Sequence, residues 1–323
     1  MPTRLSRRLV LGVSLASLLS SPLAFAQAKP WPTAKPITWM VGFVPGGSVD
    51  ALTRAFAQSI SAQIGQTIVI ENKPGASGAL ALQAAARAGN DGYTLITIPG
   101  PVVHATRQPG VDKEFRAIGL LSQGPIVMIG GAANAPADLS ALIAAMKKTP
   151  DRWTFASSGT GTGQHLAGEL FNSMAGTQMT HIPYRGGGQA VSDIMGGQVS
   201  LGMLGATPVL PHIQSGALKA YAVTTPYRIP SLPDVPTMEE AGLKGYDATQ
   251  YFVMAAPAGI DPAIVDKLNA SIAIAARSPE VTQALSAGGQ VFQPLSPADT
   301  QRFVQKSLDK FQDVARRANI RFN

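Results

Sequence analysis

The amino-acid sequence predicts an α/β protein built from two lobes, each a mostly parallel sheet flanked by helices. The chain has 323 residues, of which 45% are hydrophobic, and this length suggests about two domains. Strand-like apolar segments alternate along it with segments of helical periodicity. The strand-like segments show little alternation of polar and apolar residues, which is typical of parallel strands covered by helices on both faces.

Residues 1–26 are typical of a secretory signal peptide. Arg4, Arg7 and Arg8 form its positive start, and the sequence AFA at 24–26 fits a cleavage site. The apolar stretch between them has about 11 residues, whereas a membrane-spanning helix needs about 20. The paired arginines also fit a twin-arginine signal, and the alternative is a general secretory signal. We expect a mature chain in the periplasm that is not embedded in a membrane.

The first α/β unit follows a short linker. Strands are predicted at 37–44, 67–71 and 93–98, where β-branched and large apolar residues gather. Helices are predicted between them at 49–64 and 78–87, from the spacing of apolar residues and from an alanine-rich run. The order is therefore strand, helix, strand, helix, strand.

A second unit of the same kind follows. Its predicted strands are 125–129, 153–157, 179–182, 199–204 and 220–223. Its predicted helices are 138–148, which begins at an Asp138 N-cap, 164–174, and one that ends near Met195. An irregular segment rich in proline covers 225–236, a strand follows at 251–255, and two helices at 263–276 and 297–318 close the chain.

We expect the chain to cross from the first lobe to the second near residue 124 and to return near residue 250. Lobe 1 would then contain residues 36–124 and 251–323, with the closing helices packed on it, and lobe 2 would contain 125–250. Two lobes joined by two crossings are suited to hinge closure over a ligand bound between them.

The composition excludes several classes of function. The chain has 26 Lys and Arg against 19 Asp and Glu. Without the three leader arginines the net charge is 23 − 19 = +4. Because no run of basic residues concentrates this charge, nucleic acid is not expected as a partner. The absence of cysteine excludes disulfides, thiolate metal sites, a cysteine nucleophile and a lipid-modified cysteine anchor. His165 and Glu169 stand four residues apart, but two ligands are too few for a metal site, and neither a metal nor a cofactor is expected.

The first candidate binding loop, 43–50, lies between a predicted strand and a predicted helix. In open α/β sheets ligands bind beyond the carboxyl ends of the strands. Gly46 and Gly47 let the backbone approach a ligand, and a helix N-terminus presents unpaired N–H groups to an anion. The alternative is a turn in which glycine merely permits tight geometry, and Asp50 is interpreted as a first-turn capping acid.

Two further glycine-rich loops open helices in the second unit. The loop at 157–165 adds the hydroxyls of Ser158, Thr160 and Thr162, but it matches neither a dinucleotide fingerprint nor a P-loop. The third loop is Tyr184 followed by Arg185 and the three glycines at 186–188, in which the arginine is either a partner for an acidic ligand or a solvated surface charge. One glycine-rich loop in each lobe predicts an anion site in the cleft.

An exported hydrolase that uses Ser158 and His165 is an alternative. No G-x-S-x-G elbow is present, and no carboxylate stands in a triad-like context. Catalytic residues are therefore not assigned.

Taken together, the motifs resemble the Bug-type receptors, the periplasmic solute-binding subunits of tripartite tricarboxylate transporters. The similarity covers nearly the whole mature chain, in order. It is carried by FVPGGSVD at 43–50, VIENKPGASG at 69–78, DGYTL at 91–95, SGTG at 158–161 with His165, IPYRG at 182–186, DIMGGQV at 193–199, VPTMEEAG at 235–242 and APAG at 256–259.

This resemblance implies a two-lobed periplasmic binding protein fold, similar to type II, that closes on a small carboxylate and delivers it to the membrane subunits of a transporter. It implies a binding protein without enzymatic activity, expected to be a monomer. In similar proteins backbone groups and bridging waters of the two loops hold the carboxylate. The ligand-binding residues implied are Phe43, Pro45, Gly46, Gly47, Ser48, Ser158, Gly159, Thr160, His165, Gly186 and Gly187, with Ala206 and Thr207 after a lobe 2 strand.

The chain departs from the family pattern in places that bear on the ligand. It has Val44 where the family usually has proline, Tyr251 and Val253 where tryptophan and glycine are common, and an unusual segment at 99–104. Phe43, Tyr184 and Tyr251 are candidates to stack on a ring. Dicarboxylates, tricarboxylates, amino acids, aromatic acids and nicotinate-like molecules therefore stay open, and a neutral ligand is the less favoured alternative. A sensor that presents its ligand to a signalling protein instead of a transporter also stays open.

Overall fold

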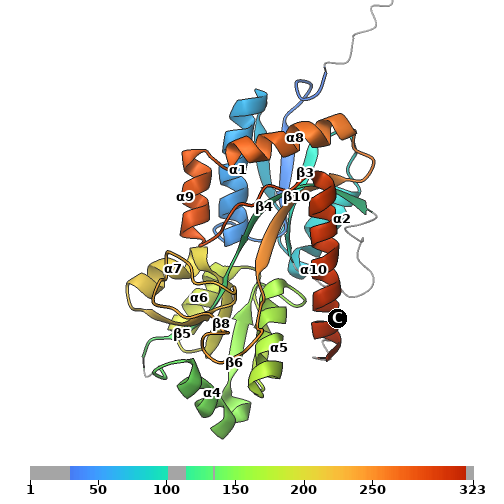
Figure 1. Ribbon diagram of the computed structural model, residues 1–323. Coiled ribbons are helices and arrows are strands. Elements are labelled where there is room, and N and C mark those ends of the chain that lie inside the picture. Colours follow the sequence, from blue (N-terminus) through green and yellow to red (C-terminus); the bar gives the residue numbers. More distant parts are fainter. Residues whose placement is uncertain (1–29, 101–113, 134, 318–323) are drawn as a thin grey trace, which may run out of the picture.

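The computed structural model describes residues 30–100, 114–133 and 135–317 (Figure 1). The expected leader, residues 1–26, and most of the unusual segment at 99–104 lie outside the described residues. The described chain forms two five-stranded sheets, each covered by helices on both faces, as the sequence predicts.

The first sheet, which with its helices we call lobe 1, has the strand order β2-β1-β3-β10-β4. Its strands are, in that order, Ile68–Asn72, Ile37–Val41, Thr94–Gly100, Gln250–Pro257 and Phe115–Gly124. β1 pairs in parallel with β2 and β3, whereas β10 runs antiparallel to both β3 and β4. The sheet is therefore parallel apart from β10, the strand that returns from the other lobe.

The second sheet, the centre of lobe 2, has the order β7-β6-β8-β5-β9. Its strands are Thr180–Pro183, Thr154–Ser157, Leu201–Gly205, Ile126–Gly131 and Leu218–Val223. β6 is parallel to β7 and β8, and β5 is antiparallel to β8 and β9. Here too the reversed strand is the one that enters from the opposite lobe. β6, β7 and β8 point their carboxyl ends at the cleft, and a helix follows each of them.

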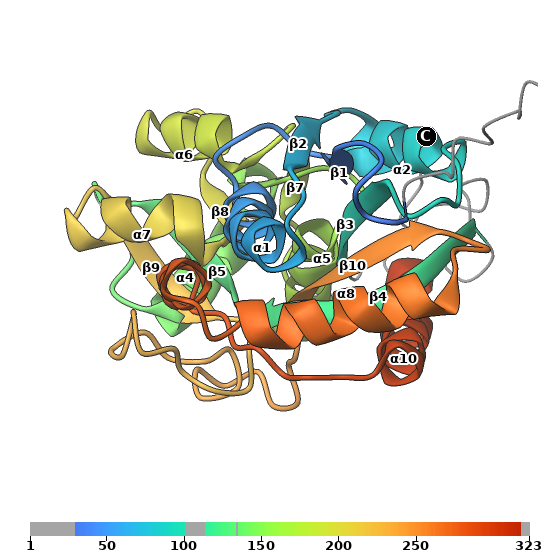
Figure 2. The same cartoon turned by 90° about the horizontal axis from the view of Figure 1, so that it is seen from above.

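Helices cover both faces of each sheet (Figure 2). In lobe 1, α1 (Ser48–Ile64), α8 (Pro262–Ala275) and α9 (Pro279–Ala287) share one apolar core, and α2 (Ala79–Ala86) covers the opposite face. In lobe 2, α4 (Leu139–Lys148) and α5 (Gly163–Ala175) cover one face, while α6 (Gly187–Met195) and α7 (Ala206–Gln214) cover the other. Neighbouring residues of one strand enter different cores, as expected for a sheet buried on both sides.

Local signals account for the helix ends. The Asp138 carboxylate accepts a hydrogen bond from the Ala141 N–H at 2.8 Å, which confirms the predicted N-cap of α4. Gly65 ends α1 in the left-handed conformation, at φ 66° and ψ 29°, where a side chain would be strained. Short 3-10 turns, Ala76–Gly78 and Pro150–Arg152, precede α2 and β6.

The last helix, α10 (Pro297–Arg317), departs from the expected packing of the closing helices on lobe 1 alone. Its first half contributes Val304 to a cluster with Leu120 and Val253 of lobe 1. Its second half contributes Phe311 and Ala315 to the core of lobe 2, against α5. A helix of 21 residues is about 30 Å long, which lets it lie along both lobes (Figure 1). The residue boundaries expected for the lobes stay a prediction.

Three elements had no counterpart in the sequence prediction. β4 contains an arginine and two glycines, so its ten residues do not resemble an apolar strand. α7 carries Pro208 and Pro211, which disfavour a helix; the first stands in the first turn, where no intrahelical N–H bond is needed. α9 is only nine residues long.

Candidate ligand-binding cleft

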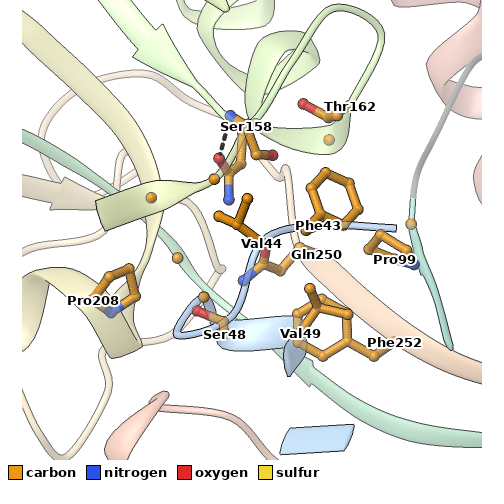
Figure 3. Close-up of a pocket in the computed structure, with 17 residues that line it drawn as sticks. Phe43, Val44, Ser48, Val49, Pro99, Ser158, Thr162, Pro208, Gln250 and Phe252 are labelled. Carbon is orange, nitrogen blue, oxygen red and sulfur yellow. Dashed lines mark hydrogen bonds between the residues drawn. The ribbon is translucent and has the colours of Figure 1, made fainter. Parts of the chain in front are cut away.

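A pocket of about 580 Å³, partly open to solvent, lies between the lobes (Figure 3). Lobe 1 lines it with Phe43, Val44, Gly47, Ser48, Val49, Pro99, Gly100, Gln250 and Phe252, and lobe 2 with Ser158, Thr162, Gly163, Gln164, Gly186, Gly187, Gly205 and Pro208.

Four helices begin at this pocket. The first residues of α1, α5, α6 and α7, or the residues that cap them, are all among its lining. The N-caps of α1, α6 and α7 are Gly47, Gly186 and Gly205, and none receives a side-chain cap bond. Their first N–H groups are therefore left without an intrahelical or capping partner, and the positive ends of the helix dipoles point toward the cleft.

None of the described residues that line the pocket carries a charge. The Ser48 hydroxyl is buried and has no hydrogen-bond partner in the protein. The Gln164 side-chain oxygen accepts the Ser158 N–H at 2.9 Å, which directs the amide NH2 of Gln164 elsewhere as a donor. The cleft therefore offers hydrogen-bond donors and helix dipoles, but no ion pair, to a bound anion.

Asp50 holds the first loop in place from behind. Its carboxylate accepts hydrogen bonds from the Gly46 N–H at 3.0 Å, from Nδ2 of Asn72 at 2.8 Å and from Nε of Arg54 at 3.0 Å. Burial raises the pKa of Asp50, but these bonds and the Arg54 charge outweigh it and keep the pKa below the usual value. Asp50 is thus fully engaged within lobe 1, in agreement with its interpretation as a structural acid.

Two histidines and two hydroxyl groups stabilise the loop at 157–165. The Gly161 N–H donates to Nδ1 of His165 at 3.0 Å, and the Thr162 hydroxyl donates to the Gly159 carbonyl at 2.7 Å. The rings of His165 and His181 stack with their centroids 3.8 Å apart, and Nε2 of His181 lies 2.6 Å from the Ser157 hydroxyl. His165 therefore shapes the loop and is not part of the pocket lining.

The buried histidine pair predicts acid sensitivity. Burial, together with the neighbouring His165, lowers the pKa of His181 from 6.5 to about 3. Below pH 6.5 the unfolded chain therefore binds a proton that the folded protein does not, so stability falls as the pH falls from about 6.5 toward 3, by up to about 1.4 kcal/mol per unit. We expect His181→Gln to flatten this dependence in urea unfolding curves between about pH 4 and 6, and His212→Gln to leave it unchanged. An unaltered slope in His181→Gln would contradict the assignment.

The structure brings together some of the residues implied by the resemblance and leaves others out. Phe43, Gly47, Ser48, Ser158, Gly186 and Gly187 line the pocket. The others do not line it. Pro45 and Gly46 are exposed, Thr160 is half-buried, and Gly159 and His165 are buried. Ala206 is in the lobe 2 core, and Thr207 is close to Gly288. Their role in binding stays a prediction.

The candidate stacking residues separate in the same way. Phe43 faces the pocket, whereas the Tyr184 hydroxyl donates to Asp193 at 2.6 Å, outside the lining. Tyr251 packs edge-on against Phe303 of α10, with ring centroids 4.9 Å apart. Because side chains alternate along β10, its neighbours Gln250 and Phe252 face the pocket instead. Arg185 is exposed and also outside the lining.

The lining residues not named as candidates come mostly from strand ends and first helical turns. They include Gln164, Gln250 and Phe252. The alternation of β10 was a usable signal for the last two. Pro208 was not predicted to line the pocket, because it belongs to α7 and the prolines of this helix prevented its prediction from the sequence.

The two lobes touch across the cleft at three glycines of lobe 2. A Cβ added to Gly159 would lie 2.5 Å from the Ser77 hydroxyl, and one added to Gly186 would lie 2.5 Å from Cγ2 of Val44. One added to Gly205 would overlap the hydroxyl of Ser48. The two lobes are therefore in direct contact across the cleft, and these contacts leave no room for a methyl group.

Neither a membrane span nor a metal cluster is found in the described parts of the chain. None of their helices has the length and apolar character to cross a bilayer. None of their groups of His, Asp or Glu brings together three or more potential ligands for an ion.

Sequence comparison agrees with the geometry. Residues 52–320 match the family described as the tripartite tricarboxylate transporter family receptor. The chain is 36% identical over 320 residues to a UPF0065 protein from the tcbD-tcbE intergenic region of Pseudomonas sp. strain P51, covering 95% of this chain and 94% of that protein. It is 33% identical over 315 residues to protein BugT of Bordetella pertussis, covering 95% of each.

Solved structures show the same fold with ligands bound. A Rhodopseudomonas palustris protein with adipate superposes with a TM-score of 0.85 at 31% identity, covering 90% of this chain and 99% of that one. MatC from R. palustris, with bound malate, superposes with a TM-score of 0.80 at 30% identity, covering 87% and 99%.

Proposed function

Because this chain belongs to the tripartite tricarboxylate transporter receptor family, we propose that it is a periplasmic solute-binding receptor that captures a small carboxylate by closing its two lobes. The relatives solved with adipate and malate hold carboxylates in the same fold. Delivery of the acid to the membrane subunits of a transporter follows from the family. Export through the leader at 1–26, and a monomeric receptor, are part of the same proposal.

The convergence of four helix N-termini on an uncharged pocket carries this proposal. The glycine N-caps Gly47, Gly186 and Gly205 leave backbone donors free, and Ser48 and Gln164 add side-chain donors. Donors of this kind match the oxygens of a carboxylate, and the helix dipoles favour its charge. Because the donors belong to both lobes, an anion between them stabilises the closed state over the open one.

We propose that the protein performs no reaction on its ligand. His165, the base in the alternative hydrolase reading, receives the Gly161 N–H on Nδ1, and its Nε2 lies 3.6 Å from Glu169. Ser158 is therefore not paired with it as a nucleophile would be. The Ser157 hydroxyl does lie beside His181, but Ser157 is fully buried and bonded within its own loop.

A thermal-shift screen of the purified mature protein tests the carboxylate assignment. We expect at least one carboxylic acid to raise the melting temperature by several degrees, because a ligand at about 100 times its Kd adds about 2.7 kcal/mol of stability. The amide of the same acid is the matched control and is expected to give no shift. Equal shifts with acid and amide would contradict a carboxylate receptor. If the NMR spectrum showed the acid being converted to a new product, this would contradict the absence of catalysis.

A further inference from the structure

On the basis of the proposed function, we propose that the ligand is a monocarboxylate with an apolar body, and that the cleft selects against a second carboxylate. The two ends of the pocket differ in chemistry. Figure 3 shows Phe43, Val49, Pro99 and Phe252 gathered on one side, whereas Ser48 and Ser158 lie toward the other.

The apolar end is built from the lobe 1 core. Phe43, Val49 and Phe252 belong to one cluster of buried residues, and Pro99 adds a further apolar wall. At the other end Gly205, the N-cap of α7, lies against the unpartnered Ser48 hydroxyl. Thr162, the N-cap of α5, lies near Phe43 (Figure 3), but its hydroxyl already donates to the Gly159 carbonyl. A ligand that uses both ends therefore has one charged head and an apolar body.

A second carboxylate has no partner at the apolar end. The side chains of Phe43, Val49, Pro99 and Phe252 have no hydrogen-bond donor, and none of the described lining residues is Lys or Arg, so these side chains do not compensate the loss of its hydration. A buried carboxylate without a hydrogen-bond or charge partner is strongly disfavoured. An aryl or alkyl group in the same place gains from leaving water.

A second cavity lies directly beyond the apolar end. It is small, and it shares Phe43 and Pro99 with the main pocket as a common wall. Leu82, Ile96 and Ile98 line it, and the Thr97 hydroxyl is already engaged by Trp39 and Thr53. The Phe43 ring therefore sets the length of apolar body that the main pocket accepts.

Isothermal titration of the wild-type protein with matched acids tests the proposal. Hexanoate and adipate differ only by the second carboxylate, as do benzoate and terephthalate. We expect at least one monocarboxylate to bind about tenfold or more tightly than its dicarboxylate partner. Adipate and terephthalate binding as tightly as their partners would overturn the inference, and so would no binding by either monocarboxylate. Hexanamide distinguishes failure of this inference from failure of the proposed function. If hexanamide binds as well as hexanoate, the proposal of a carboxylate receptor itself is wrong.

A variant at the shared wall tests the role of Phe43. We expect Phe43→Leu to raise the affinity for decanoate relative to hexanoate by about tenfold, because a smaller side chain joins the two cavities. Phe303→Leu, on the far side of β10, is the matched control and is expected to keep the wild-type ratio. The ratio of two ligands in one variant is insensitive to a general loss of stability, and an unchanged ratio in Phe43→Leu would overturn the length assignment.

Discussion

Replacing Gly47 by Asp is expected to weaken carboxylate binding about a thousandfold while leaving the empty protein at least as stable as wild type. The backbone at Gly47 is extended, at φ −78° and ψ 167°, and a Cβ there meets no atom within 4 Å. Aspartate is a favoured N-cap, so its carboxylate would accept the free N–H groups of α1 in place of the ligand. Two like charges about 4 Å apart at a protein surface repel by about 4 kcal/mol, which corresponds to roughly a thousandfold in Kd.

Gly47→Asn separates charge from volume. Asparagine caps the helix equally well and fills the same space, but it carries no charge. We expect it to bind the acid clearly more tightly than Gly47→Asp, in titrations of the acid with the largest thermal shift. Equal losses in the two variants would show that steric exclusion, not the helix dipole and charge, governs the site. Wild-type affinity in both variants would show that the loop at 43–50 does not contact the ligand.

Replacing Gly205 by Ala is expected to weaken ligand binding by about 5- to 150-fold without destabilising the ligand-free protein. The backbone at Gly205, with φ −62° and ψ 152°, suits any residue. The added methyl group would overlap the Ser48 hydroxyl and lie 3.2 Å from Nε2 of Gln250. Overpacking of this kind costs about 1–3 kcal/mol. The contact with Ser48 joins the two lobes, so the cost is expected mainly in the closed state and reduces the affinity of a ligand that requires closure.

Gly188→Ala is the matched control for closure. It lies in the first turn of α6, near the start of a lobe 2 helix as Gly205 does, but a Cβ there meets no atom within 4 Å. We expect wild-type affinity for this variant. Small-angle scattering of Gly205→Ala with ligand is expected to retain a larger fraction of the extended, open form. If Gly205→Ala bound the ligand as tightly as wild type and became as compact in scattering, the proposal that the contact between Gly205 and Ser48 restricts closure would be contradicted.

Much of the fold follows from local sequence. The strands β1, β3 and β8 are short apolar runs, and the helices α1 and α5 carry amphipathic periodicity. Each of these signals indicates its element within a few residues. The strand, glycine loop, helix order then predicts that the loops meet at the carboxyl ends of the strands. Elements without such a pattern, namely β4, α7 and α9, were not predicted, because tertiary packing stabilises them against weak local preference.

The sequence by itself determined the class of the protein, and it predicted the loops of the candidate site. Its glycine-rich loops before helices are local features, and so are the absence of cysteine and the motifs shared with the Bug-type receptors. Only the tertiary structure decided which side chains line the cleft. Phe252 and Gln250 line the cleft while Tyr251 faces α10, and His165 lies behind its loop instead of in the pocket. The physical reason is that facing depends on strand register and on how the two lobes meet, and residues far apart in the sequence set both.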